Sequence, residues 1–160
     1  LDEDLQHEFH STFTKEWHAW LDAGYGECQL RRSDVRDLLM RRLTAEPSLD
    51  AWVIMPNHFH ALVEPVEGSE LGGIVQRWKG GSAREINLAR GASGKLWQHE
   101  PFDHIVRSEA QLDHFRRYIA LNPAKAGLRA GYIIGIGTES DLSAEDVLER
   151  FGLKCEAKYS

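Results

Sequence analysis

Two short apolar runs separated by a Pro-Asn pair constrain the fold of this chain most strongly. Trp52–Met55 and His58–Val63 are each short and rich in apolar and β-branched residues, so both predict strands. Pro56-Asn57 between them is typical of a tight turn. The segment therefore predicts a β-hairpin.

Apolar residues at helical spacing predict helices on either side of this hairpin. Ser33 and Ser108 are the expected N-caps of two of them. The expected helical ranges are residues 4–23, 33–43, 69–88, 108–121 and 142–151.

Glycine and proline modify this pattern at three places. Gly80-Gly81 predicts a kink or a break inside the third helix, and Pro123 predicts an end or a kink of the fourth. Gly131–Gly137 is rich in glycine and isoleucine and predicts one last strand. Because no linker, repeat or low-complexity segment interrupts the chain, residues 1–160 are expected to form one domain.

The composition is that of an ordinary globular domain, with 42% hydrophobic and 28% charged residues among 160. No apolar run approaches the ~20 residues needed to cross a bilayer. The acidic opening at Leu1–Leu5 is unlike the basic start of a signal peptide. Only Cys28 and Cys155 are present, which predicts no disulfide framework. We therefore expect a cytoplasmic protein that makes no membrane contact.

The net charge of −6 argues at first against a nucleic-acid partner, but its distribution argues for one. Residues 71–130 carry 10 Lys/Arg and 5 Asp/Glu, a net of +5. They lie between acidic segments with net charges of −8 (residues 1–70) and −3 (residues 131–160). A surface that faces phosphates requires a local basic segment of this kind, although the asymmetry can also arise by chance.

His58 and His60 are the first residues that carry chemistry. Residues two apart on a strand point to the same face, so both imidazoles are predicted to project together, with Phe59 on the other side. Two neutral imidazoles on one face can bind a divalent metal. A pair of surface or hydrogen-bonded histidines is the alternative, and this spacing alone does not decide between the two.

Tyr118 and Asn122 are the second such feature. They lie four apart in a predicted helix and share one face, at the rim of its apolar stripe rather than inside it. A phenolate can attack phosphorus and hold DNA covalently, and an amide oxygen can bind a metal. By position alone, a buried tyrosine ring and an asparagine that ends the helix before Pro123 are the simpler explanation.

Together these motifs resemble those of a known family. The run VIMPNHFHALV at residues 53–63 resembles the strand of the HUH (histidine-hydrophobic-histidine) single-tyrosine transposases, and YIALNPAKAGL at residues 118–128 resembles their tyrosine helix. The resemblance covers about residues 24–128 and is strongest to the branch associated with repetitive extragenic palindromes. Four further patterns lie between the two motifs in the family's order: Trp78-Lys79-Gly80, Ile86-Asn87, Leu96-Trp97-Gln98 and Phe102–Arg107.

The resemblance implies a role for each residue of the site. His58 and His60 would be two ligands of Mg²⁺ or Mn²⁺, Asn122 the third ligand, and Tyr118 the nucleophile. The implied reaction is cleavage of single-stranded DNA, at palindromic or hairpin sequences, that leaves a 5′-phosphotyrosine and a free 3′-hydroxyl. The implied fold is α+β, an antiparallel sheet with helices packed on it. It would be ferredoxin-like or similar to an RNA-recognition motif, with the HUH motif on a strand and the tyrosine on a helix.

Further residues are candidates for supporting roles. His104 and His114 are candidates for the base that activates the tyrosine. Trp78 and Trp97 are candidates for stacking on unpaired bases, although helical spacing also favours Trp78 as a core residue. Eight basic residues are candidates for phosphate contacts: Arg77, Lys79, Arg84, Arg107, Arg116, Arg117, Lys125 and Arg129.

Two departures from the family leave alternatives open. The family usually opens with a strand before its first long helix, whereas this chain opens in a predicted helix, so we expect the first strand to be missing. The tail after Leu128 also differs. A nucleic-acid-binding module of the same fold without turnover is the main alternative, and a phosphodiesterase that uses water is another. We expect single-stranded or hairpin DNA as the partner, and either a monomer or a homodimer.

Overall fold

The structure is a computed structural model of the chain, and it describes residues 28–97 and 105–154. The predicted helix over residues 4–23 lies outside these ranges. Within them, no helix combines the length and the apolar character needed to cross a membrane. The elements follow in the order η1 (Gln29–Arg31, a 3-10 helix), α2 (Ser33–Thr44), β1 (Leu49–Ile54), β2 (Phe59–Val63), α3 (Leu71–Arg90), α4 (Glu109–Lys125), β3 (Ile133–Ile136) and α5 (Ala144–Arg150).

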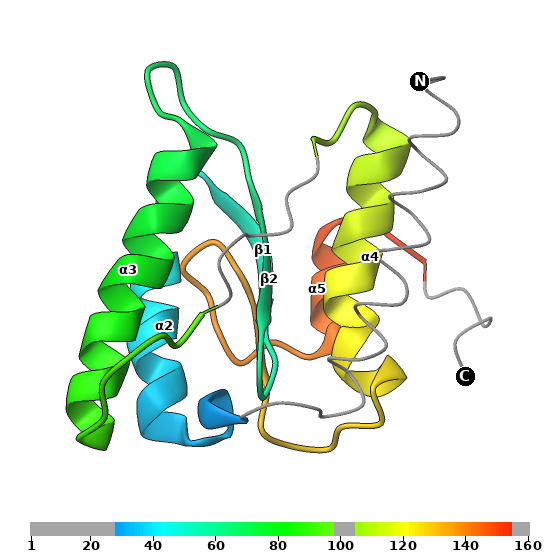
Figure 1. Cartoon of the computed structure of the whole chain (residues 1–160). Helices are drawn as coiled ribbons and strands as arrows, with labels where there is room; N and C mark the ends of the chain where they lie inside the picture. The colour runs from blue at the N-terminus through cyan, green and yellow to red at the C-terminus, as the bar shows by residue number, and fades with distance from the viewer. Residues whose placement is uncertain (1–27, 98–104, 155–160) are drawn as a thin grey trace, which may run out of the picture.

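The three strands form one antiparallel sheet in the order β2-β1-β3 (Figure 1). β1 and β2 are the two arms of the predicted hairpin, and Val53 of β1 lies opposite His60 of β2. On its other side, Val53 lies opposite Ile134 of β3, the strand predicted from the stretch rich in glycine and isoleucine. The predicted α+β class, with helices on an antiparallel sheet, is confirmed.

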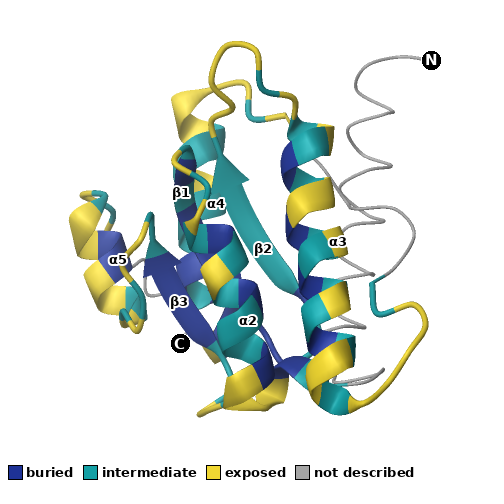
Figure 2. Ribbon diagram, turned by 90° about the vertical axis from the view of Figure 1, so that its left-hand side faces the viewer, coloured by how far each residue is buried: buried dark blue, intermediate teal, exposed yellow. Residues whose placement is uncertain are grey.

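Helices cover both faces of this sheet, α2 and α3 on one and α4 and α5 on the other (Figures 1 and 2). Successive side chains of β1 point alternately into the two layers. Trp52 and Ile54 join the core under α2 and α3, while Ala51 and Val53 join the core under α4 and α5. Because both faces are covered, all four of these side chains are fully buried.

α3 is one unbroken helix, so a break at Gly80-Gly81, one of the two outcomes predicted there, is wrong. A glycine in a helix interior costs about 0.5–1 kcal/mol relative to alanine, but packing against α2 overrides this preference. A Cβ atom on Gly81 would lie only 2.6 Å from Nη1 of Arg42. The absence of a side chain therefore lets the Arg42 guanidinium lie against α3, where it pairs with Glu85.

α4 begins where predicted, because the Ser108 hydroxyl accepts a hydrogen bond from the Gln111 N–H. It does not end before Pro123 but continues to Lys125. The Ala126 N–H still reaches the Asn122 carbonyl at 3.0 Å, so the last turn closes after the proline. α2 differs from expectation by one position, since Ser33 is its first residue rather than its cap.

The indole of Trp52 on the neighbouring strand leaves room only for a glycine at position 135 of β3. A Cβ atom on Gly135 would lie 2.2 Å from Cζ2 of Trp52 and 2.3 Å from the backbone oxygen of Glu139. The same indole donates its N–H to the Gly137 carbonyl at 3.0 Å. The fully buried Trp52 is therefore held against the backbone of β3, which leaves no room for a side chain at position 135.

We expect Gly135→Ala to lower the free energy of unfolding by about 1–3 kcal/mol, the usual cost of overpacking a core. Urea denaturation measures this directly. Gly72→Ala is the matched control, because Gly72 lies in α3 with no atom within 4 Å of an added Cβ. That change should be neutral or stabilising. Equal stability of Gly135→Ala and the unsubstituted protein would contradict the packing described for Trp52.

Candidate active site

His58 and His60 lie side by side at the start of β2. His60 belongs to the strand, whereas His58 lies in the turn just before it and not on the strand as predicted. The His58 carbonyl accepts from the Met55 N–H at 2.8 Å, which closes the hairpin. The centroids of the two imidazole rings are 4.8 Å apart, with the ring planes at 81°. The two rings therefore lie at one site, and their role as metal ligands stays a prediction.

Phe59 points away from this pair, toward the opposite layer. Its ring lies 6.2 Å from that of Trp78 and 5.4 Å from that of Trp97. Trp78 is buried, with 4% of its surface exposed, and the Trp97 indole N–H donates to the Ser82 hydroxyl at 3.0 Å. The two tryptophans therefore pack in the core between the sheet and α3, and Trp78 has the core position that its helical spacing favours.

Tyr118 of α4 approaches the histidines from the other side of the site. Its ring centroid lies 5.2 Å from that of His60, with the planes at 77°. The next two residues, Ile119 and Ala120, are buried in the core under α4. Tyr118 is half-buried, so it lies at the rim of that core as predicted.

Asn122 lies one helical turn after Tyr118 and is more deeply buried than predicted. None of its surface is exposed, so it lies inside the core rather than at the rim. Neither its amide nitrogen nor its amide oxygen has a hydrogen-bond partner among the described residues. A buried polar group left in this state costs about 1–3 kcal/mol. A ligand bound to the amide oxygen would offset this cost, so a buried, unpaired asparagine is a plausible place for a ligand to bind.

The ligand types offered by the two histidines and Asn122 fit a divalent metal. Two imidazole nitrogens and one buried amide oxygen are acceptable ligands, and the amide supplies the oxygen that Mg²⁺ and Mn²⁺ prefer. No group of three or more His, Cys, Asp or Glu residues suited to a metal occurs in residues 28–97 and 105–154. A metal at this site would therefore depend on Asn122 as well as on the histidines.

Lys125 is the basic candidate that lies beside the tyrosine. It is exposed in the last turn of α4, and its ammonium nitrogen lies 6.0 Å from the centroid of the Tyr118 ring. The spacing of seven residues puts the two side chains on one face of the helix. Lys125 therefore adds positive charge close to Tyr118.

The basic candidates of α3 lie in the other layer. Arg77, Lys79 and Arg84 belong to α3, which packs on the face of the sheet opposite to α4 (Figure 1). Arg77 pairs with Glu46 at 3.0 Å, and burial lowers the pKa of the half-buried Lys79. The segment with a net charge of +5 therefore does not form a single surface around Tyr118, because its two helices are separated by the sheet.

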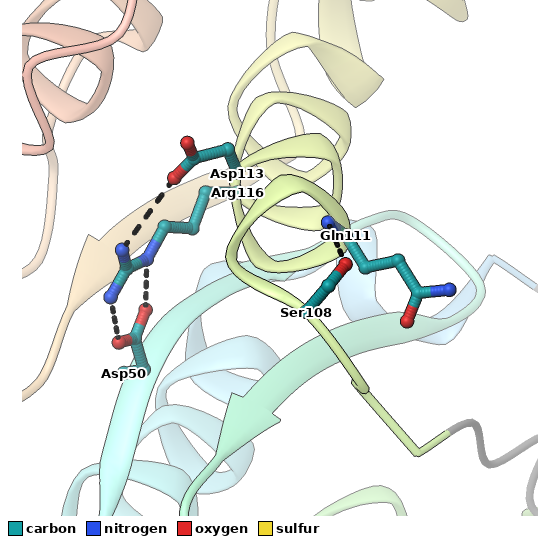
Figure 3. A network of polar contacts seen from close by, with 5 residues as sticks. All are labelled: Asp50, Ser108, Gln111, Asp113 and Arg116. Carbon is teal, nitrogen blue, oxygen red and sulfur yellow. Dashed lines mark hydrogen bonds and ion pairs between the residues drawn. The ribbon is translucent and has the colours of Figure 1, made fainter.

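Arg116 is held by partners within the protein (Figure 3). Its guanidinium donates to the two carboxylate oxygens of Asp50 in β1 at 3.1 and 2.6 Å, and it lies 4.0 Å from Asp113. These hydrogen bonds raise the pKa of Arg116. The guanidinium carbon also lies 4.0 Å from the ring centroid of Phe151, which follows α5. Arg116 therefore ties the tyrosine helix to the sheet. Of the other candidates, Arg117 is half-buried, while Arg107 and Arg129 are exposed.

Asn57 lies at the site beside His58, although its sequence context indicates only a turn residue. In the structure, Nδ1 of His58 lies 2.7 Å from Oδ1 of Asn57, within hydrogen-bond distance. The only sequence signal for this contact is the position of Asn57 directly before a candidate ligand. Asp50 is similar, because its pairing with Arg116 joins residues far apart in the chain and leaves no local pattern.

These elements define an α+β protein in which a histidine pair on a hairpin faces a tyrosine on a helix. The family profile described as "Transposase IS200 like" matches residues 40–122, which include His58, His60, Tyr118 and Asn122. The chain therefore belongs to the IS200-like transposase family.

Two curated relatives match part of the chain. A REP-associated tyrosine transposase of Escherichia coli (strain K12) is 29% identical over 79 residues, covering 49% of this chain and 46% of that protein. An uncharacterized protein of Haemophilus influenzae is 29% identical over 99 residues, covering 47% of this chain and 53% of that protein. The chain thus spans about half the length of the curated relatives it matches. No solved structure matches it.

Proposed function

We propose that this chain is a metal-dependent endonuclease and strand transferase that cuts single-stranded DNA at palindromic or hairpin sequences, with Tyr118 as its nucleophile. The observation that carries the proposal is the contact of the Tyr118 ring with that of His60, on a helix that carries the buried amide of Asn122 one turn further on. Membership of the IS200-like transposase family supports a transposase-type function. The proposed whole fold is the ferredoxin-like arrangement of an antiparallel sheet and helices.

His58, His60 and Asn122 would hold the metal, Mg²⁺ or Mn²⁺. When bound, the ion would neutralise charge on the scissile phosphate. The three residues come from a turn, a strand and a helix that pack together, so the protein would offer the site largely preformed. This arrangement would place the phosphate within reach of the Tyr118 oxygen, which favours attack by proximity.

The covalent step follows from the chemistry of a phenol. The Tyr118 oxygen forms a bond to phosphorus, the bond from phosphorus to the 3′ oxygen breaks, and that oxygen takes up a proton. The phenol proton passes to a base. His114, exposed one turn before Tyr118 on α4, is the described candidate for that base, and His104 lies outside the described residues. The phosphotyrosine ester keeps the bond energy, so a second strand can be joined without ATP.

Cleavage of labelled oligonucleotides tests this function. We expect a single-stranded oligonucleotide with a hairpin to be cut in Mg²⁺ or Mn²⁺ and to stay intact in a chelator. A fully paired duplex of the same sequence is the control and should resist cleavage. Binding of the hairpin without any cleavage in either metal would instead favour a binding module of the same fold.

Lys125 is expected to contribute one phosphate contact to DNA binding. We expect Lys125→Ala to weaken binding of single-stranded DNA and to lower the slope of log affinity against log salt by about 0.7, the share of one phosphate contact. Filter binding or fluorescence anisotropy at several salt concentrations measures this slope, and a Tyr118→Phe background prevents covalent capture.

Lys95→Ala is the matched control for this experiment. Lys95 is also exposed, but it lies in the loop after α3. Its loss should leave the slope nearly unchanged. Equal slopes for Lys125→Ala and Lys95→Ala would mean that the charge beside Tyr118 does not contact DNA.

A further inference from the structure

We propose that Asn57 is a positioning residue for His58, and that it holds the imidazole in the tautomer with the proton on Nδ1 and the lone pair on Nε2. A metal ligand needs that lone pair. This inference rests on the proposed metal site. It assigns a role to a residue that is neither a proposed metal ligand nor the proposed nucleophile.

The geometry of the turn supports this role. His58 Nδ1 lies 2.7 Å from Oδ1 of Asn57, and His58 is buried, with 8% of its surface exposed. The backbone around the pair is fixed at two points. The Met55 N–H donates to the His58 carbonyl at 2.8 Å, and the Leu30 N–H donates to the Pro56 carbonyl at 2.9 Å. The amide and the ring are therefore presented to each other by a closed, well-bonded turn.

The chemistry of the two groups determines which nitrogen carries the proton. A neutral imidazole has one N–H donor and one acceptor nitrogen, and an amide oxygen can only accept. A short contact between Oδ1 and Nδ1 therefore requires the proton on Nδ1. The lone pair then lies on Nε2, on the opposite side of the ring. Histidine ligands commonly donate their other ring N–H to an oxygen, which fixes both the tautomer and the orientation of the ring.

The neighbouring residues show why this orientation matters here. The His58 and His60 rings meet nearly at right angles, with centroids 4.8 Å apart, and the His60 ring in turn contacts Tyr118. For two rings to share one ion, each must present a lone pair toward it. Loss of the Asn57 oxygen would allow His58 to carry its proton on Nε2, and metal affinity should fall by roughly 10- to 100-fold, as is usual for an outer-shell partner.

Imidazole NMR of the metal-free, full chain tests the inference without relying on activity. Two-bond ¹H–¹⁵N correlations of the histidine rings distinguish the two tautomers, and a His58→Gln variant assigns the His58 signals. The spectra are recorded at about pH 8.5, where an imidazole with an ordinary pKa of about 6.5 is neutral. Calorimetric titration of the same samples with Mn²⁺ gives the metal affinity.

Three variants are compared with the unsubstituted protein. Asn57→Ala removes the acceptor, Asn57→Asp keeps an acceptor oxygen, and Asn87→Ala is the matched control. The Asn87 amide donates to the Gly94 carbonyl at 2.8 Å in the α3 layer, away from the histidines. Circular dichroism confirms that each variant is folded before it is compared.

The inference predicts that His58 carries its proton on Nδ1 in the unsubstituted protein and in Asn57→Asp and Asn87→Ala. In Asn57→Ala the Nε2–H tautomer should appear, and Mn²⁺ affinity should fall at least about 10-fold. An unchanged tautomer in Asn57→Ala, or a changed tautomer with unchanged Mn²⁺ affinity, would overturn the role of Asn57 while leaving the proposed function intact. Absence of Mn²⁺ binding by the unsubstituted protein would instead overturn the proposed metal site itself.

Discussion

Asn122→Leu is expected to make the metal-free protein more stable and, at the same time, to remove most of its affinity for Mn²⁺. The amide is fully buried and has no hydrogen-bond partner among the described residues. Leucine has the same branching without polar atoms, so the free energy of unfolding should rise by about 1 kcal/mol. Losing the amide oxygen should lower Mn²⁺ affinity on the order of 10-fold or more.

Urea denaturation in a chelator and in saturating Mn²⁺ measures both effects. Mn²⁺ at 100 times its dissociation constant should stabilise the unsubstituted protein by about 2.7 kcal/mol, and it should stabilise Asn122→Leu much less. Asn122→Ala separates packing from ligation, because it opens a cavity yet should share the weakened Mn²⁺ response and show cleavage that excess Mn²⁺ partly restores. A less stable Asn122→Leu variant with normal Mn²⁺ binding would show that the amide has a structural role instead.

Tyr118→Phe is expected to abolish DNA cleavage and to leave DNA binding nearly unchanged. The substitution removes only the phenol oxygen and keeps the ring that packs against His60. Binding should rest on phosphate contacts elsewhere. Removing the nucleophile of a covalent mechanism should lower the cleavage rate by a factor on the order of 10⁴ or more.

Cleavage rate and DNA affinity, each measured in Mg²⁺ and in Mn²⁺, separate the two effects of Tyr118→Phe. Neither metal should restore cleavage, in contrast to Asn122→Ala. Tyr132→Phe is the matched control, since Tyr132 packs against the same core before β3 and should cleave normally. A Tyr118→Phe variant that cuts at an unchanged rate would assign the attack to water.

Local sequence signals predicted the elements that hold the site. The Pro56-Asn57 turn between two apolar runs predicted the hairpin, and the Ser108 cap predicted the start of α4. Both signals depend on a few adjacent residues, so they can be recognised without knowledge of the tertiary structure. The contact between the histidine pair and the tyrosine was implied only by the family resemblance, because no local rule brings a hairpin and a distant helix together.

Other features depend on packing that no local pattern reports. α3 continues through Gly80-Gly81 because the Arg42 guanidinium occupies the space of a missing side chain. α4 continues past Pro123, whereas the proline predicts a helix end near that point, and Asn122 is fully buried in this last part of the helix. The basic segment is divided between two layers because its helices pack on opposite faces of the sheet, a property of topology rather than of charge.

Detection of a covalent link between DNA and Tyr118 tests the proposed function most directly. The unsubstituted protein is incubated with a hairpin-containing single strand in Mn²⁺, the product is digested with protease, and the nucleotide-bearing peptide is mapped by mass spectrometry. We expect a phosphodiester-linked peptide that contains Tyr118 and carries the 5′ end of the downstream strand, with a free 3′-hydroxyl on the upstream strand. Cleaved DNA with no linked peptide, or a link at any other residue, would contradict the proposed function.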